Sequence, residues 1–391
     1  MYKLIPKKMR EQLSPLLSGF YLPVHHFTSV TDNEEDRVVV IYLGINKGRA
    51  RLWGKRILGS EFTQTPKGKM WVWALEKQLN NKIPDCNLVM IETNWVTELI
   101  LARYKGFKMP MWIQLCLDVS RPLRELKKSS TKLREQIPRL IRKYSLELEI
   151  SSDEKDLDEF IDTMHIPYIS GRHKDTAFIS SRAEIKKMFD NSDLFFVRKD
   201  GKRISGTLVE YSDDMASLHY IGLKDNNPEY LRVGGIASLY YFAILHAIDK
   251  GISVFNMGGT SPFLSDGVAF FKLTLKPYVM RTSYLGDYFI KLILRKPSPY
   301  LSEFLINNPF LNLHDRNHFE KIIFIDNSQS GYEKKLNELL NKTYCERVER
   351  TVYAVNNDSP DSKLFIESII PEGEKVEIVS WDSMFNIREA S

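Results

Sequence analysis

The stretch from residue 231 to residue 277 constrains the fold more than any other, because glycines divide it into apolar segments of defined length. Gly234 and Gly235 open a mostly apolar run that closes at Gly251. The run has the length of a globular helix, and a glycine just after the last turn is a common helix end. The sequence therefore predicts a helix over 234–250, entered through a turn of small residues.

A short strand and a second helix follow. Residues 254–256 are β-branched, aromatic or polar and lead into Gly258 and Gly259, which predicts a strand with a tight end. Ser265 or Asp266 then caps a helix that carries Lys272. The first N–H groups of a helix have no partner within the helix and attract anions. This succession of strand ends and helix starts predicts a ligand site.

The other segments place these elements in a larger pattern. The second half has the order β-β-β-α-β-α-β, with predicted strands at 194–198, 203–211, 216–223 and 278–285 beside those above. The first half has the order β-β-α-β-α-β, with predicted strands at 37–44, 50–56, 87–92 and 109–119 and helices at 70–79 and 96–104. The chain thus contains two versions of one layout.

A length of 391 residues indicates two or three domains. We expect a first domain over 1–145, a second over 146–318 and a small α/β unit over 319–391. Residues 286–318 mix apolar residues with cations and prolines. They fit a connector packed on the core or a segment at a membrane surface, and both interpretations stay open at this point.

Charge and cysteine content narrow the environment. A net charge of +5 fits a polyanionic partner such as CoA, nucleic acid or phospholipid without selecting one. Three cysteines without paired spacing argue against a disulfide framework and a zinc site, and favour buried thiols in a reducing compartment. The first residues lack the apolar core of a secretory signal. We expect a cytoplasmic protein, with peripheral contact at the inner face of the membrane as an alternative.

A basic segment over 121–143 joins the two halves. It holds nine Lys or Arg residues against Glu125 and Glu135, and its apolar residues recur at helical spacing. Pro138 is expected to kink or split the helix. The charges fit either a solvated helix face or contact with a phosphate-bearing partner.

The small-residue turn before helix 234–250 reads Arg232-Val-Gly-Gly-Ile-Ala237, which fits an Arg-x-x-Gly-x-Ala pattern. It resembles the loop with which acyl-CoA-binding N-acyltransferases of the GNAT type hold a pyrophosphate. Small residues let the backbone approach the anion, and the helix start supplies N–H groups and a positive dipole end. The pattern does not match a P-loop or a dinucleotide fingerprint.

Residues 35–285 more broadly resemble the Fem-type peptidyltransferases and the related CelD-like acyltransferases, which consist of two fused GNAT-like domains. The resemblance rests on Tyr220-Ile-Gly-Leu, Phe255-Asn-Met-Gly-Gly259 and Asp266-Gly-Val-Ala-Phe-Phe-Lys272, in that order, after the basic segment. It implies two tandem GNAT-like domains of the α/β (α+β) class, with mixed, mostly antiparallel sheets and an α/β appendage. Asn256 stands where the family often has Asp, and the glycine that usually follows Phe-Lys is absent.

The resemblance also implies roles for individual residues. Lys272 would lie at the acyl-transfer centre and neutralise the donor phosphate or the oxyanion, although a solvated helix lysine is the alternative. His219 or Glu210 would act as general base. The donor would be bound by Arg232, Gly234, Gly235, Ala237 and Asn256. The acceptor would be bound by Arg172, His173 and Tyr220. Because neighbouring strand residues face opposite ways, only one of His219 and Tyr220 is expected to face the substrate.

The sequence thus predicts an acyltransferase that transfers an acyl group from acyl-CoA to an amine of an amino sugar, an amino acid or a cell-envelope precursor, without a metal. His25-His26 lacks partners at metal-ligand spacing. Two alternatives stay open. One is a Fem-type transferase that uses aminoacyl-tRNA, and the other is a binding protein that keeps the fold without the chemistry.

Overall fold

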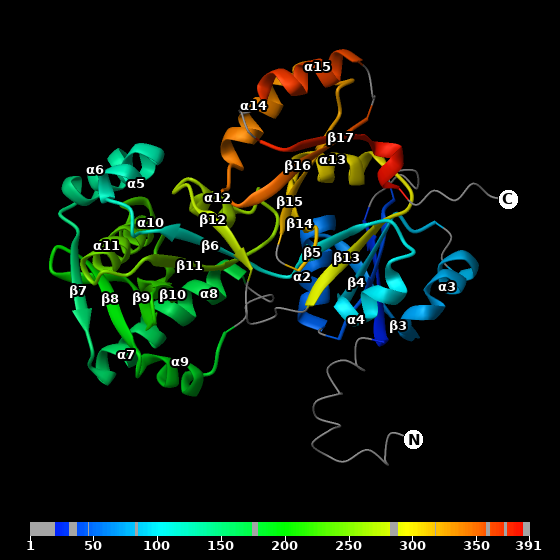
Figure 1. Cartoon of the computed structure of the whole chain (residues 1–391). Helices are drawn as coiled ribbons and strands as arrows, with labels where there is room; N and C mark the ends of the chain where they lie inside the picture. Colours follow the sequence, from blue (N-terminus) through cyan, green and yellow to red (C-terminus); the bar gives the residue numbers. More distant parts are fainter. Residues whose placement is uncertain are drawn as a thin grey trace.

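The computed structural model describes residues 20–30, 37–45, 47–82, 85–173, 179–281, 288–316, 318–356, 360–370 and 374–385. Its strands form three sheets, of six, seven and four strands. Figure 1 shows the six-stranded and seven-stranded sheets at opposite ends of the molecule, with the four-stranded sheet against the first. The predicted class, α/β with mixed sheets, is confirmed.

The six-stranded sheet, sheet A, has the order β3-β1-β2-β4-β13-β5. Its strands are β1 (Tyr21–Ser29), β2 (Val39–Leu43), β3 (Phe62–Trp71), β4 (Leu88–Asn94), β5 (Phe107–Pro110) and β13 (Tyr288–Leu294). Only β2 and β4 pair in parallel. Helices α2 (Lys47–Leu58), α3 (Leu75–Lys82) and α4 (Trp95–Leu101) accompany this sheet. Apolar cores lie on both of its faces, since neighbouring β2 residues Val40 and Ile41 belong to different clusters.

The seven-stranded sheet, sheet B, has the order β12-β6-β11-β10-β9-β8-β7. Its strands are β6 (Ile113–Asp118), β7 (Glu147–Ser151), β8 (Ser192–Lys199), β9 (Lys202–Ser212), β10 (Met215–Leu223), β11 (Val254–Thr260) and β12 (Tyr278–Arg281). Only β10 and β11 pair in parallel. Both large sheets are therefore mixed and mostly antiparallel, as predicted.

Helices cover both faces of sheet B. One face carries α7 (Glu154–Phe160), α8 (Ile166–His173) and α9 (Arg182–Phe189). The other carries α5 (Leu123–Ser129), α6 (Ile137–Lys143), α10 (Pro228–Arg232) and α11 (Gly235–Asp249), while α12 (Gly267–Leu273) follows β11. Gly251 has a left-handed φ of 72° directly after α11, which explains why glycine ends this helix.

Each large sheet contains a strand from the other half of the chain. The apolar segment 109–119, expected as one strand, divides at Met111 and Trp112: β5 stays in sheet A, and β6 pairs with β11 and β12 in sheet B. In return, β13 lies between β4 and β5. Both β6 and β13 thus pair across the expected boundary at 145, and the two sheets are linked by two crossings of the chain.

The four-stranded sheet, sheet C, has the order β14-β15-β16-β17. Its strands are β14 (Phe310–Leu313), β15 (Phe319–Ile325), β16 (Val348–Val355) and β17 (Val376–Ser380), and the last three pair in parallel. Helices α14 (Tyr332–Lys342) and α15 (Pro360–Ile369) connect these parallel strands. Residues 319–385 thus form the expected α/β unit, and α15 is an addition to the prediction.

The prediction of a strand over 50–56 is wrong: these residues belong to helix α2, because Ala50, Trp53 and Ile57 recur at helical spacing and are all buried. Of the two interpretations of residues 286–318, the described part supports a segment packed on the core. Strand β13 is a buried inner strand of sheet A, and α13 (Pro299–Asn307) packs Leu301 and Leu305 into the core. The length of an apolar run did not distinguish an inner strand from a connector.

The helix of the basic segment is interrupted at Ser130, where the backbone is extended, and not at Pro138. A π-helical turn over Lys132–Gln136 runs directly into α6, and Pro138 lies in the first turn of α6. Proline lacks an N–H group, and the first turn of a helix does not need one. The helix therefore continues through Pro138 instead of splitting there, and the π-helical turn before it accommodates the proline.

Candidate active site

Strands β10 and β11 separate part-way along their length. They pair in parallel from Met215 with Val254 to Ser217 with Asn256, and no further. The Asn256 side chain holds the point of divergence, because its Oδ1 accepts from the Gly258 amide at 3.0 Å and its Nδ2 donates to Ser217 Oγ at 3.4 Å. Asn256 therefore uses its amide inside the protein. The result is an opening between two strands whose facing backbone groups no longer bond each other.

Lys272 lies at the end of β11 and not in solvent. Its side chain is only 2% exposed, and Nζ donates hydrogen bonds to the carbonyl oxygens of Gly258 at 2.8 Å and Gly259 at 3.1 Å. Burial lowers the pKa of Lys272 to about 7. Asp266 caps α12 by accepting from the Val268 amide at 3.0 Å, which fixes the helix that carries the lysine. Lys272 is thus poised between charged and neutral forms.

His219 and Glu210 form a pair on neighbouring strands. His219 Nε2 lies 3.2 Å from Glu210 Oε2, an ion-pair distance without hydrogen-bond alignment. Burial lowers the pKa of His219, and the nearby Glu210 carboxylate opposes this shift. The imidazole is therefore mostly neutral near pH 7, as a general base must be.

The strict alternation expected of His219 and Tyr220 does not hold. Tyr220 has a left-handed φ of 48°, and the β10–β9 register shifts between His219 and Gly222. This bulge breaks the alternation of side chains, so Tyr220 packs with the cluster on the α7–α9 face, and its ring centroid lies 6.2 Å from that of His219. The two rings therefore lie near each other.

His165, which the sequence analysis did not single out, belongs to the same group. It ends a π-helical turn, Ile161–His165, between α7 and α8, and its ring meets Tyr220 edge-on at 5.4 Å. Nδ1 lies 3.0 Å from the Ile221 carbonyl oxygen, while the buried Nε2 has no hydrogen-bond partner. Burial lowers its pKa, so Nε2 presents a lone pair. The nearby Pro167 was the available signal, because π-helical turns accommodate irregularities and occur often at functional sites.

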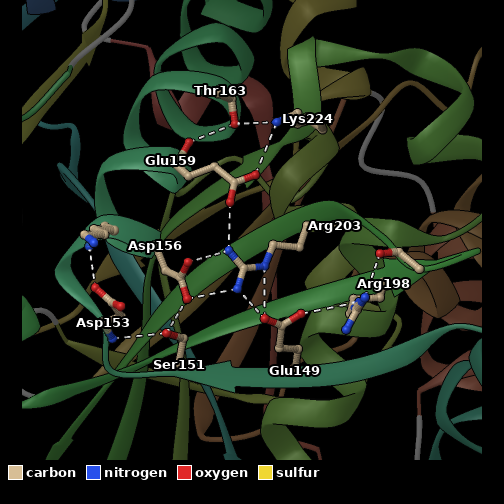
Figure 2. Close-up of polar contacts among 11 residues, drawn as sticks. Glu149, Ser151, Asp153, Asp156, Glu159, Thr163, Arg198, Arg203 and Lys224 are labelled. Carbon is tan, nitrogen blue, oxygen red and sulfur yellow. Dashed lines mark hydrogen bonds and ion pairs between the residues drawn. The ribbon is translucent and has the colours of Figure 1, made fainter.

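A polar network around Arg203 holds this π-helical turn against sheet B (Figure 2). Arg203 of β9 donates to Asp156 of α7 at 2.7 Å, to Glu159 of α7 at 2.7 Å and to Glu149 of β7 at 3.0 Å. Lys224, just after β10, donates to Glu159 and to Thr163 within the π-helical turn. The bonds to these carboxylates raise the pKa of Arg203. The network therefore fixes the helix that carries His165.

Residues of α8 approach α11 and α12. Arg172 donates to the Tyr168 hydroxyl at 2.7 Å, and its guanidinium lies near Gly267 at the start of α12. Arg172 and His173 lie in the last turn of α8, not in a loop as predicted, because the π-helical turn carries the helix past Pro167. The His173 side chain lies outside the described residues. Arg172 is thus placed beside the helix that carries Lys272.

The predicted phosphate-binding turn is well packed. Gly234 has a left-handed φ of 98°, and a side chain there would meet Leu140 of α6. Gly235 is equally crowded, since a Cβ would lie 2.9 Å from the Tyr230 carbonyl oxygen. Arg232 is 75% exposed and pairs with Glu229 at 2.6 Å, while Ala237 is half-buried. The two glycines thus have a packing role, and Arg232 points into solvent.

The basic segment lies beside this turn. Lys127 of α5 contacts the Tyr241 ring of α11, and Lys132 contacts the Phe271 ring of α12, both at 5.7 Å. Within the described residues, ion pairs of this segment involve only Arg121 and Arg134. The cations without an ion pair are Arg124, Lys127, Lys128, Lys132, Arg139, Arg142 and Lys143. A large positive surface therefore flanks the start of α11.

The three cysteines are buried and free, as expected, and burial raises their pKa. In the described part of the chain, no group of three or more His, Cys, Asp and Glu residues could hold a metal ion. None of the helices described here has the length and apolar character needed to cross a bilayer.

No protein-family model matches the chain, and no curated protein matches it in sequence. Solved structures that resemble it include FemX, at 12% identity and a TM-score of 0.36 over 73% of this chain and 90% of that chain. Another is L-PGS from Bacillus licheniformis, at 12% identity and a TM-score of 0.34 over 73% and 91%. An aminoglycoside acetyltransferase from an uncultured soil metagenomic sample has 20% identity and a TM-score of 0.27 over 35% and 90%. Likeness at these scores carries no argument by itself, so the fold assignment rests on strand order and register.

Proposed function

We propose that this protein is an N-acyltransferase in which an amine attacks an activated acyl carbonyl at the opening between β10 and β11. The observation that carries the proposal is the end of parallel pairing at Ser217 and Asn256, with His219 and Lys272 beside the divergence. Such an opening would admit an extended acyl carrier, whose amides would bond the β10 backbone beyond Ser217, because the Gly258 and Gly259 groups of β11 are already engaged. A neutral imidazole and a buried amine supply the two proton-transfer groups that acyl transfer needs.

In the proposed reaction, one carbon–nitrogen bond forms and one carbon–sulfur bond breaks. The acceptor ammonium loses a proton to His219, directly or through one water, and Glu210 stabilises the imidazolium that forms. The amine nitrogen then bonds to the acyl carbon. The carbon–sulfur bond of the thioester breaks, and the leaving thiolate takes the second proton, which the nitrogen releases as the amide forms. Lys272 retains an N–H beyond those given to Gly258 and Gly259, with which it can stabilise the oxyanion.

The proposed donor is acyl-CoA. Its phosphates would meet Arg232, the half-buried Ala237 amide and the cations of the basic segment, with the glycine turn shaping the entry. The proposed acceptor is an amine of an amino sugar, an amino acid or a cell-envelope precursor. It would approach from the α7–α9 face, where Tyr220, His165 and Arg172 provide polar contacts.

A second candidate is transfer from aminoacyl-tRNA. Two observations favour it. Gly234 and Gly235 are buried, so few amides at the start of α11 are open to a pyrophosphate. The seven cations without ion pairs on α5 to α6 form a surface larger than a diphosphate requires. The chemistry at His219 and Lys272 would be unchanged, because the aminoacyl ester replaces the thioester.

Thermal shift with acetyl-CoA, longer acyl-CoAs and tRNA tests the proposal, followed by an assay for free thiol with a panel of amines. We expect stabilisation by acyl-CoA and thiol release that depends on the amine. Arg232→Ala with Ala237→Glu should weaken CoA binding about tenfold or more, whereas Lys334→Ala, on exposed α14, should not. Stabilisation by tRNA alone selects the second candidate. No response to either donor supports the non-catalytic alternative and ends the proposal.

A further inference from the structure

A patch of exposed apolar side chains lies on sheet A, away from the candidate active site. It consists of Tyr21 (42% exposed), Trp71 (45%), Trp73 (50%), Val96 (43%) and Leu99 (80%). They come from β1, the end of β3, the turn that follows it and α4. Figure 1 shows β3 and α4 at the end of the molecule opposite α7 and α11. A cluster of this kind marks an interaction surface, because exposed Trp and Leu are otherwise scattered.

The aromatic rings of the patch form one continuous stack. Trp73 and Trp71 are stacked at 4.5 Å, and Trp71 and Tyr21 follow at 4.6 Å. Phe20 lies 6.2 Å from Trp73 at one end, and Lys69 Nζ lies 5.7 Å from Tyr21 at the other. The ring faces are therefore used within the protein. Tyr21, Trp71 and Trp73 nevertheless remain 42–50% exposed, so the outward surface of the stack consists of the parts of these rings that do not contact one another.

Helix α4 extends the patch with aliphatic side chains. Val96 and Leu99 lie one turn apart on α4, and Arg103 lies in the turn that follows the helix. Arg103 donates to the Trp73 carbonyl oxygen at 3.3 Å, so this end of α4 borders the aromatic stack. Leu99, at 80% exposed, is the most exposed large apolar side chain in the described part of the protein.

The charges beside the patch are positive. Lys69 and Trp71 lie two residues apart in β3 and are both exposed, and Lys67 is exposed beyond a β-bulge at which Gly68 has a left-handed φ. Arg103 adds a third cation, and no ion pair of these three occurs among the described residues. Glu98 of α4 turns inward and bonds the buried Lys291 at 2.6 Å. The patch thus combines aromatic rings, aliphatic side chains and a cationic rim.

We propose that the patch formed by Tyr21, Trp71, Trp73, Val96 and Leu99 binds the surface of a membrane that contains anionic lipid. Aromatic rings with polar groups suit the headgroup layer, and Val96 and Leu99 reach the acyl boundary. Lys67, Lys69 and Arg103 attract anionic headgroups. A nucleic acid is disfavoured because base stacking needs free ring faces, and these are occupied.

Vesicle sedimentation with the full chain tests this surface, using phosphatidylcholine with and without phosphatidylglycerol. We expect binding that requires phosphatidylglycerol, weakens with salt and shifts tryptophan fluorescence to the blue. Trp71→Ala with Trp73→Ala should lower binding about tenfold or more, and Leu99→Ser about fivefold. The matched controls are Trp112→Ala and Leu364→Ser, which change exposed side chains elsewhere and should leave binding intact.

Three results would overturn the proposal. One is equal binding by patch and control variants, or none by the unaltered protein. Another is a dimer in solution that Leu99→Ser dissolves, which assigns the patch to a second copy of the chain. The third is displacement from vesicles only by RNA. Should the double tryptophan variant misfold, Lys69→Glu with Leu99→Ser decides the question, because both side chains project from the surface.

Discussion

The Nζ atom of Lys272 donates to the Gly258 carbonyl oxygen at 2.8 Å, at a left-handed bulge within β11. Gly258 has a φ of 80°, and a Cβ there would lie 2.8 Å from the Leu218 carbonyl oxygen of β10. The glycine therefore serves two purposes: it turns its carbonyl toward the buried amine, and it lets β11 approach β10 before the strands part. Lysine and strand end form one unit.

Burial of Lys272 makes stability depend on pH. Its pKa falls from 10.5 to about 7 on folding, so between these values the unfolded chain holds a proton that the folded chain lacks. Stability then rises with pH across that window and is lowest below about pH 7. We expect the unfolding free energy of the protein, relative to Lys272→Met, to rise by roughly 4 kcal/mol from pH 7 to pH 10.5. Urea denaturation of both proteins measures this, and a constant difference would contradict it.

The His219–Glu210 pair should set the pH at which kcat/KM falls on the acidic side of the pH–rate profile. His219→Ala is expected to lower kcat/KM about 100-fold or more, because the base is lost. Burial places the pKa of His219 below 6.5, and Glu210 raises it. Glu210→Gln should therefore move the acidic limb to lower pH. A pH–rate profile in the N-acylation assay measures both. An unchanged limb in Glu210→Gln would separate this pair from catalysis.

Much of the fold follows from local patterns, and the rest depends on pairing between distant residues. Glycine punctuation and apolar length located α11, β11 and the meander of β8, β9 and β10. No local pattern shows that β13 pairs with β4 and β5, because the same apolar run would suit any buried strand. The helical spacing of α2 was present in Ala50, Trp53 and Ile57, but a short alternating run over the same residues indicated a strand.

The candidate site was predictable in position but not in chemistry. Ala269, Lys272 and Leu273 share the buried face of α12, so the i, i+3, i+4 rule could have placed the lysine inside, while Phe270 is exposed. The left-handed backbone at Tyr220 has no sequence signal, since tyrosine rarely adopts it. His165 enters the site only through a π-helical turn, and such turns follow from tertiary packing.

Gly222 allows that π-helical turn to contact β10. A Cβ at this position would lie 2.6 Å from the His165 amide nitrogen and 2.7 Å from the Met164 carbonyl carbon. Both are backbone atoms, so relief requires the helix to move. We expect Gly222→Ala to destabilise the protein by about 1–3 kcal/mol. Gly259→Ala is the matched control, because nothing lies within 4 Å of its Cβ position, and it should change stability by less than about 0.5 kcal/mol. Equal stability of the two variants would refute this contact.

Replacing Arg203 should destabilise the protein more than replacing an exposed arginine that also pairs with carboxylates. Its side chain is 19% exposed and bonds three carboxylates, so Arg203→Met leaves Glu149, Asp156 and Glu159 facing one another. Since the site is only partly buried, we expect a loss of about 2–3 kcal/mol, measured by urea denaturation. Arg182→Met is the control: Arg182 also pairs with two carboxylates but is 44% exposed, so its loss should destabilise the protein less than the loss of Arg203.

The same substitution should change the response to acid. Bonds from Arg203 lower the pKa of Asp156 below 3.8, so this carboxylate contributes stability above its unfolded pKa and loses it as pH falls through the folded value. Arg203→Met removes the main cause of that shift. Its destabilisation relative to the unaltered protein should therefore shrink below about pH 4. The network also fixes the helix that carries His165, so we expect Arg203→Met to lower kcat/KM on the acidic side of the pH profile. Arg182→Met should leave that part of the profile unchanged. Loss of stability without any change in kcat/KM would limit Arg203 to a structural role.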